Sequence, residues 1–263
     1  MSLTAGHSAA PLLELRGVSR QFGSLRAVDG VNLEVMAGRI TGLIGPNGAG
    51  KTTLFNLIAG ALAPSSGEIR FQNQRIDGLS PDRIFHRGLA RTFQVPRPFS
   101  NMTVLENLMV AASGQAGERF WNNWTRPAAV RAQERATRER ARAVLEVCAL
   151  SDKAGVLAGQ LSGGQQKLLE LARVLMIEPR LILLDEPGAG VNPALLDTLV
   201  ERVQRLHAGG IAFLVIEHNM DLVMSVCDPV VVMMQGRVIL NGSPEAVRSD
   251  ARVVDAYLGE VAP

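Results

Sequence analysis

A glycine-rich stretch followed by a lysine and a threonine is the part of this sequence that indicates its chemistry most directly. The stretch consists of Gly45, Pro46, Asn47, Gly48, Ala49, Gly50, Lys51, Thr52 and Thr53. It fits the spacing G-x-x-x-x-G-K-[ST], in which backbone N–H groups surround phosphate oxygens at the start of a helix. In this spacing Lys51 supplies a charge for the β- and γ-phosphates, and the Thr52 hydroxyl can ligate Mg²⁺. The alternative is a glycine-rich turn before an ordinary helix.

Acidic residues follow two apolar runs later in the chain: Asp185 and Glu186 follow the first, and Glu217, with His218 next to it, follows the second. We interpret both runs as strands of a parallel sheet, in which ligands bind outside the carboxyl ends of the strands. Because a carboxylate after aliphatic residues is costly without a cation or water, Asp185 is predicted to hold Mg²⁺ through its outer sphere. Glu186 is predicted to orient and deprotonate an attacking water. The alternative for Glu186 is a carboxylate that caps the next helix.

A second helix start carries small and polar residues. Leu161, Ser162, Gly163, Gly164 and Gln165 precede a helix predicted over residues 166–176. Two glycines and a serine at a helix start can form an anion site, or Ser162 can be a simple N-cap. Two phosphate-binding helix starts in one chain suggest that the second loop of one subunit closes over the nucleotide held by another.

The flanking segments indicate which elements position these residues. Residues 39–44 read as a buried strand and residues 53–59 as a helix with an apolar face, on either side of the glycine-rich loop. Fully apolar strands alternating with helices indicate a parallel sheet covered on both faces. The remaining predictions are antiparallel strands at 12–15 and 31–35, a turn at 21–24, strands at 181–184 and 211–216, helices at 193–207 and 220–226, and a hairpin at 230–240. Helical signals dominate from 94 to 160, with a mostly solvated helix at 127–150.

Composition limits the class of protein. The chain has 263 residues with 27 basic and 25 acidic side chains, a balance that does not call for nucleic acid or an anionic membrane as partner. Cys148 and Cys227 lie far apart without metal-ligand spacing, which predicts free thiols in a reduced compartment. Residues 1–11 lack the features of a secretory signal. No apolar run approaches the roughly 20 residues that span a bilayer, so any service to a membrane is expected to go through a partner.

Taken in order, these motifs resemble the ATP-binding subunits of ABC transporters. The resemblance covers nearly the whole chain, and the pentapeptide at 161–165 is its most specific element. It implies that Phe22 stacks on adenine, although Phe22 could also be a core residue. It implies that Gln94 senses Mg²⁺ and links the core to a helical subdomain. It also implies that His218 contacts the γ-phosphate and the catalytic Glu186.

The fold that this resemblance implies is α/β: a phosphate-loop (RecA-like) core with a parallel sheet, an antiparallel β-subdomain and an inserted α-helical subdomain. Residues 1–263 would form one domain, in which 12–93 and 166–263 are the nucleotide-binding core with its β-subdomain. Residues 94–165 would be the helical subdomain.

A closer resemblance narrows the substrate to branched-chain amino acids. The residues that are similar to the ATPases of those importers lie at 88–94, 101–108, 186–193, 216–224 and 256–260. Residues 114–142 resemble the insert of the longer of the two ATPases in such systems. Asn192 stands where many ABC proteins carry an aspartate, which leaves open any role that needs a charge across the subunit interface.

The resemblance implies ATP and Mg as cofactors and a location at the cytoplasmic face of the inner (plasma) membrane as a peripheral protein. The implied partners are a second ATPase subunit, identical or homologous, transmembrane permease subunits and, indirectly, a periplasmic substrate-binding protein, with no nucleic acid. Other cargoes (urea, short amides or a lipid) stay open, as do a soluble ABC ATPase and a non-hydrolysing regulator. The roles of Trp121 and Trp124, subdomain core or partner contact, also stay open.

Overall fold

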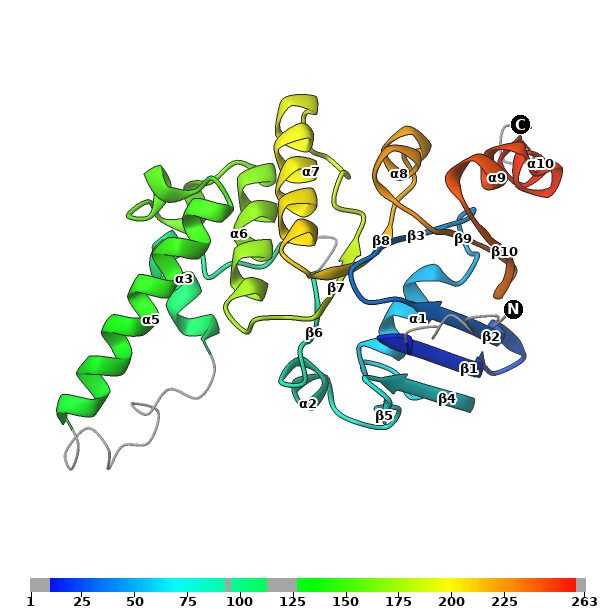
Figure 1. The fold of residues 1–263 in the computed structure, drawn as a ribbon, viewed down its shortest axis with the longest axis horizontal. Helices are drawn as coiled ribbons and strands as arrows, with labels where there is room; N and C mark the ends of the chain where they lie inside the picture. Colours follow the sequence, from blue (N-terminus) through cyan, green and yellow to red (C-terminus); the bar gives the residue numbers. More distant parts are fainter. Residues whose placement is uncertain (1–9, 93–95, 113–126, 259–263) are drawn as a thin grey trace, which may run out of the picture.

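The computed structural model describes residues 10–92, 96–112 and 127–258, whose strands form two sheets (Figure 1). The antiparallel sheet has the order β2-β1-β4-β5 and consists of β1 (Leu13–Phe22), β2 (Leu25–Val35), β4 (Ser66–Phe71) and β5 (Gln74–Arg75). The larger sheet has the order β10-β9-β3-β8-β7-β6. Its strands are β3 (Ile40–Ile44), β6 (Leu89–Arg91), β7 (Leu181–Asp185), β8 (Ala212–Ile216), β9 (Val230–Met234) and β10 (Arg237–Gly242). All of its pairs are parallel except the β9–β10 hairpin at the edge, which the sequence predicted.

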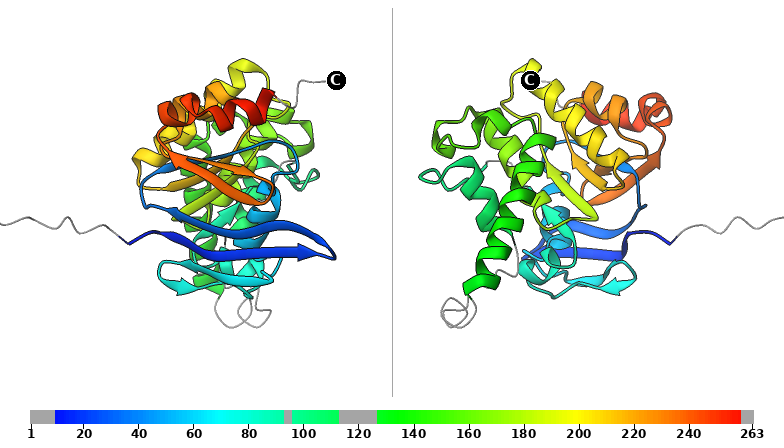
Figure 2. Two further views of the ribbon diagram at one scale, coloured as in Figure 1. Left: turned by 90° about the vertical axis from the view of Figure 1, so that its right-hand side faces the viewer. Right: turned by 60° about the vertical axis from the view of Figure 1, so that its left-hand side comes forward.

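Helices cover the larger sheet and extend beyond one end of it. They are α1 (Lys51–Ile58), α2 (Pro81–Phe85), α3 (Val104–Ala111), α5 (Pro127–Val147), α6 (Gly163–Leu175), α7 (Pro193–Ala208), α8 (Met220–Val226), α9 (Pro244–Ser249) and α10 (Ala251–Leu258). In Figure 1, α3, α5 and α6 lie together at the left end. Figure 2 shows α7 and α8 on the side of the larger sheet that faces away from the antiparallel sheet.

The central strands of the larger sheet are buried on both faces, as their uninterrupted apolar sequences predicted. Every residue of β3, β7 and β8 is buried. Side chains alternate between two cores because successive residues of a strand point to opposite faces. Ile182 and Leu184 pack in the core that includes residues of α6 and α7. Leu181 and Leu183 pack in the core that the sheet shares with α1 and the antiparallel sheet. The phosphate-loop α/β fold with an antiparallel β-subdomain is therefore confirmed.

The longest helix at the helical end of the molecule buries few of its residues. Helix α5 is 21 residues long, but only Val130, Ala141 and Leu145 are buried, which confirms the predicted solvated helix. The fully buried Asn107 in α3 fixes the preceding loop. Its Oδ1 accepts from the N–H of Phe99 at 2.9 Å, and its Nδ2 donates to the carbonyl oxygens of Phe99, Met102 and Thr103 at 3.1, 3.3 and 3.0 Å. The three carbonyl oxygens also accept backbone N–H groups, so the buried amide adds to the backbone hydrogen bonds of this loop.

The first strand is longer than the sequence pattern predicted. Alternation stops after Leu15 because Gly17, with φ 57°, introduces a register shift against β2, and pairing then resumes at Val18. Such a bulge turns the following side chains to the other face of the sheet. The alternation of apolar and polar residues is therefore interrupted, and the sequence pattern ends before the strand does. The predicted turn at 21–24 is therefore wrong in its first half, because Phe22 still pairs with Leu25.

Helix α6 begins at Gly163 rather than at residue 166. Ser162 is its N-cap, so the two glycines belong to the first turn of the helix. The division that we expected between residues 165 and 166 falls within this helix. Gln94, Trp121 and Trp124 lie outside the described residues. Within the described part of the chain, none of the helices has the length and apolar character needed to cross a membrane.

Candidate functional site

The glycine-rich loop forms a turn between β3 and α1. Gly45 and Gly50 have φ values of 148° and 99°, which favour glycine. Both positions are also crowded. A Cβ atom on Gly45 would lie 2.0 Å from the carbonyl oxygen of Met233, and one on Gly50 would lie 2.2 Å from that of Ala27. These two glycines are required because the loop is pressed against the backbone of β9 and β2.

Lys51, the first residue of α1, is buried and closes the loop. Its ammonium donates to the carbonyl oxygens of Gly45 at 2.6 Å and Pro46 at 2.9 Å. A buried ammonium needs such acceptors. Its charge adds to the partial positive charge of the first backbone N–H groups of α1. This arrangement has the chemistry that suits an anion, and anion binding by the loop stays a prediction.

The turn of the β9–β10 hairpin supports this loop from the other side. The N–H of Gly236 donates to the carbonyl oxygen of Ala49 at 3.0 Å, and the N–H of Asp29 donates to that of Gly236 at 2.9 Å. The Arg237 guanidinium donates to the Asp29 carboxylate at 2.7 and 2.9 Å, and this hydrogen bond lowers the pKa of Asp29. Three segments that are distant in sequence thus fix the loop's outer wall.

Glu186 and His218, which follow two different strands, meet at the edge of the sheet. The parallel register sets Asp185 beside Ile216, so the residues that follow lie side by side. Nε2 of His218 lies 3.0 Å from Oε1 of Glu186. The backbone of Glu186 has φ 48°, and its N–H donates to the carbonyl oxygen of Ile216 at 2.9 Å. A carboxylate that can accept a proton is thus oriented by an imidazole that can donate a hydrogen bond.

Asp185 is paired with an arginine that the sequence analysis did not single out. Nη2 of Arg91 donates to Oδ2 of Asp185 at 2.7 Å, and the side chains are 13% and 6% exposed. Nη1 of Arg91 donates to Oδ1 of Asn56 in α1 at 2.5 Å, and the guanidinium carbon lies 5.8 Å from the Phe55 ring centre. The available signal was a charged residue ending the short buried strand β6, because such a charge requires a partner.

An open cavity of about 500 Å³ is lined by part of the glycine-rich loop and by the two residues that meet at the sheet edge. Its lining includes the loop residues Asn47 to Thr53 together with Glu186 and His218. Leu25, Arg26, Ala27, Gln235 and Gly236 complete the wall. Phe22 does not line this cavity but pairs with Leu25, which does. Phe22 is 43% exposed and is covered by the Arg20 guanidinium at 4.7 Å, so it is not a core residue.

The segment from Leu161 to Gln165 lies elsewhere and contributes nothing to the lining of this cavity. Ser162 and Gln165 form a reciprocal capping box, with the Gln165 N–H donating to the Ser162 hydroxyl at 3.4 Å and the Ser162 N–H donating to Oε1 of Gln165 at 3.0 Å. The N-cap interpretation is therefore correct as geometry. Ser162 and Gly163 are exposed, whereas Gly164 is buried and a Cβ there would lie 2.0 Å from Cδ2 of Leu195. The start of α6 is thus packed on its inner side and open on its outer side.

Two of the predicted ligands of a divalent cation carry oxygen donors. Thr52 lines the cavity, whereas Asp185 at the end of β7 does not line it and is buried against Arg91. Arg91 bridges Asp185 to Asn56 of α1, so this carboxylate lies next to the helix that carries Thr52. Hydroxyl and carboxylate oxygens suit Mg²⁺, which binds through few protein ligands and keeps several waters. In the described part of the chain, groups of three or more His, Cys, Asp or Glu residues that could hold a metal by themselves are absent.

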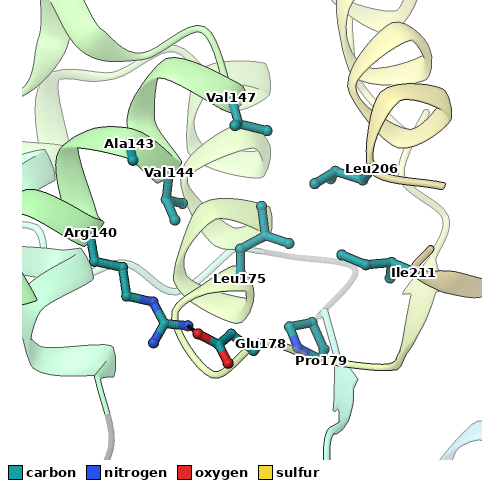
Figure 3. A pocket seen from close by; sticks show the side chains of 9 residues that line it. All are labelled: Arg140, Ala143, Val144, Val147, Leu175, Glu178, Pro179, Leu206 and Ile211. Carbon is teal, nitrogen blue, oxygen red and sulfur yellow. Dashed lines mark ion pairs between the residues drawn. The ribbon is translucent and has the colours of Figure 1, made fainter. Parts of the chain in front are cut away.

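A second, more apolar hollow lies between α5, α6 and α7 (Figure 3). Val144, Leu175 and Ile211 point into it, and the ion pair of Arg140 with Glu178, at 3.0 Å, lies at its rim. The predicted phosphate-binding and acidic residues are absent from its lining. The candidate site is therefore the cavity at the glycine-rich loop.

Comparison with known proteins places the chain in a family. Residues 28–189 match the family described as ABC transporter, and residues 237–263 match the one described as branched-chain amino acid ATP-binding cassette transporter. The chain is 43% identical over 251 residues to the high-affinity branched-chain amino acid transport ATP-binding protein BraF of Pseudomonas aeruginosa, covering 95% of this chain and 98% of the relative. It is 40% identical over 253 residues to the corresponding Escherichia coli protein, LivG, with the same coverage.

Solved structures show the same likeness in three dimensions. A nucleotide-free ATP-binding cassette from an ABC transporter superposes with a TM-score of 0.82 at 38% identity, covering 94% of this chain and 98% of that one. The ADP conformation of an ATP-binding cassette of an ABC transporter also gives 0.82, at 39% identity, covering 95% and 99%. The likeness therefore spans both sheets and the helical end.

Proposed function

The chain belongs to the ABC transporter family, and on this premise we propose that it is the ATP-hydrolysing subunit of a membrane importer for branched-chain amino acids. The proposal of ATP hydrolysis rests on the contact between Glu186 and His218 at the phosphate-loop cavity. The names of the two relatives and the match over residues 237–263 support the cargo. The protein acts at the cytoplasmic face of the membrane through permease subunits.

The loop from Gly45 to Thr53 holds the triphosphate of ATP. Backbone N–H groups bind the phosphate oxygens, and Lys51 turns from the loop carbonyls toward the β- and γ-phosphates. Phe22 stacks on adenine beside the cavity. When Mg²⁺ is bound, it neutralises charge on the β- and γ-phosphates. Thr52, Asp185 and Gln94 are the residues that would hold it.

Glu186 is the general base. Its carboxylate accepts a proton from the water whose oxygen attacks the γ-phosphorus, as the bond from that phosphorus to the β-bridging oxygen breaks and ADP leaves. His218 holds the carboxylate in place through its hydrogen bond and contacts the γ-phosphate. Gln94 senses Mg²⁺ and links the core to the helical subdomain, residues 94–165.

A second subunit completes the site. Ser162, Gly163 and Gly164 at the open start of α6 bind the γ-phosphate held by the partner, with Leu161 and Gln165 shaping the turn. This assignment is supported because Ser162 and Gly163 are exposed yet do not line the cavity of their own chain. The subunits close on ATP and open after hydrolysis, and the helical subdomain passes this motion to the permeases.

The test of hydrolysis is the variant Glu186→Gln in the assembled transporter. We expect phosphate release to fall by about 10²–10⁴-fold, since a general base is lost, while ATP still binds. Glu201→Gln, an exposed glutamate on α7, is the matched control and should keep wild-type turnover. Wild-type turnover of the Glu186 variant would refute the assignment of the base.

The test of the cargo is uptake by cells that lack this chain. Uptake of labelled leucine, isoleucine and valine should be lost and should return with the intact chain but not with Glu186→Gln. Unchanged uptake of these amino acids, with loss of urea or short-amide uptake, would overturn the cargo and leave the ATPase assignment standing.

A further inference from the structure

Lys167, in the second turn of α6, lies outside the motifs described above and has an uncommon set of partners. Its ammonium donates to the carbonyl oxygens of Glu186 at 3.0 Å, Pro187 at 3.0 Å and Ala189 at 2.6 Å. An ammonium group has three N–H donors. Each of them is therefore used on the turn that follows β7, the turn that contains the base.

The same turn is held from its other side by an acid. Oε1 of the buried Glu217 accepts from the N–H of Gly188 at 2.5 Å, and its Oε2 accepts from the N–H of His218 at 3.1 Å. Lys167 thus binds the carbonyl oxygens of the turn and Glu217 binds an amide. Between these two anchors the backbone of Glu186 keeps its left-handed conformation, which non-glycine residues adopt only when their surroundings enforce it.

Partial burial lowers the pKa of the Lys167 ammonium, and the carboxylates of Glu217, Glu170 and Glu186 offset only part of that effect. Charge-assisted hydrogen bonds to three carbonyls are about twice as strong as neutral ones. The link between α6 and the turn is consequently a stiff one.

The start of α6 also packs against the segment that continues from the turn into α7. A Cβ on Gly164 would lie 2.0 Å from Cδ2 of Leu195 and 3.2 Å from Cγ1 of Val191. Gly164 therefore brings the start of α6 into close contact with the residues that follow the turn. Lys167 joins two functional parts of one chain: Glu186, which serves this chain's own nucleotide, and the start of α6, which serves the partner's.

We propose that Lys167 is a positioning residue that couples the two ATP sites of the dimer, by fastening the turn that carries the base to the helix that completes the opposite site. This inference rests on the proposed function. It deepens that function by naming a physical link between sites that belong to different nucleotides.

The first experiment compares Lys167→Met, which keeps the length of the side chain but has no donor, with Lys167→Arg, which keeps charge and donors. We expect kcat to fall about 10–100-fold in the methionine variant, because small misplacement of a catalytic group has effects of that size. KM for ATP should stay within about threefold, since Lys167 does not line the cavity. The arginine variant should recover most of kcat. Lys153→Met, a surface lysine paired with Asp152, is the matched control.

The second experiment isolates the coupling in pairs of one intact and one variant subunit. The variant subunit carries Glu186→Gln, so only one of the two ATP sites can still hydrolyse ATP. In that site the intact subunit supplies Glu186, and the variant subunit supplies the start of α6. Adding Lys167→Met to the same variant subunit should lower the remaining turnover at least threefold. Unchanged turnover would refute coupling between sites, and wild-type kcat in Lys167→Met would refute the positioning role as well.

Two controls separate this proposal from its premise. Thermal unfolding of each variant shows whether it is folded. If Lys167→Met is not folded, Lys167→Arg is the variant on which the proposal is tested. If Glu186→Gln in both subunits leaves hydrolysis intact, the proposed function itself fails. If that variant is inactive and the mixed pairs are insensitive to Lys167, only the coupling fails.

Discussion

Removing the guanidinium of Arg91 should destabilise the fold far more than an ordinary loss of an ion pair. In Arg91→Met, the carboxylate of Asp185 stays buried but loses its partner at 2.7 Å, and Asn56 loses its donor. Breaking a buried pair in this way costs about 3–5 kcal/mol in the free energy of unfolding. For a chain of this size each kcal/mol shifts Tm by about 2–4 °C, so we expect a loss of about 6–20 °C.

The matched control uses the same chemistry at the surface. Arg39 donates to Asp228 at 3.2 Å, and their side chains are 54% and 61% exposed. Since pairs exposed on both sides contribute little to stability, Arg39→Met should lower Tm by less than about 4 °C. Both variants are measured by calorimetry without nucleotide.

A double variant tests the cause. Adding Asp185→Asn to Arg91→Met removes the uncompensated charge, so the combined loss should be clearly smaller than the sum of the two single losses. Equal Tm shifts for Arg91→Met and Arg39→Met, or strictly additive losses in the double variant, would show that burial of Asp185 is not what makes Arg91 necessary.

Two further predictions follow from the loop and from the cysteines. Gly50→Ala should abolish ATP binding in a nucleotide-binding assay while a folded circular dichroism spectrum remains, because its φ of 99° and the Ala27 carbonyl 2.2 Å from a Cβ force the loop to move; wild-type affinity would contradict this. Burial raises the pKa of both Cys148 and Cys227 to about 12, so these thiols stay protonated when folded. They should therefore resist a disulfide reagent at pH 8 and react on unfolding. Above the ordinary thiol pKa they should progressively lose their stabilising contribution as the pH rises toward 12; fast labelling of the folded chain would contradict the burial.

Much of the site could be predicted because its motifs are local. The spacing from Gly45 to Thr52 encodes a strand, a turn and a helix start within a few residues, and the structure has each of them. Acids that directly follow apolar strands could also be assigned to one edge, since parallel strands end together. The start of α6 was placed three residues late because a capping box at Ser162 admits glycines to the first turn of the helix.

The partners of these groups could not be predicted, because they are chosen by packing between distant segments. Nothing in the order of residues pairs Arg91 with Asp185, or Lys167 with the carbonyl oxygens of residues 186, 187 and 189. The bulge at Gly17 likewise hid the length of β1, since its register is set by β2.

By itself, the sequence determined which groups are present and which of them begin helices or end strands. Only the tertiary structure decided which groups meet, such as His218 with Glu186 and Lys167 with the turn that holds that base. The physical reason is that spacing along a chain specifies backbone conformation over a few residues. Contacts across the sheet edge depend instead on strand order, register and helix packing, which the whole chain sets together.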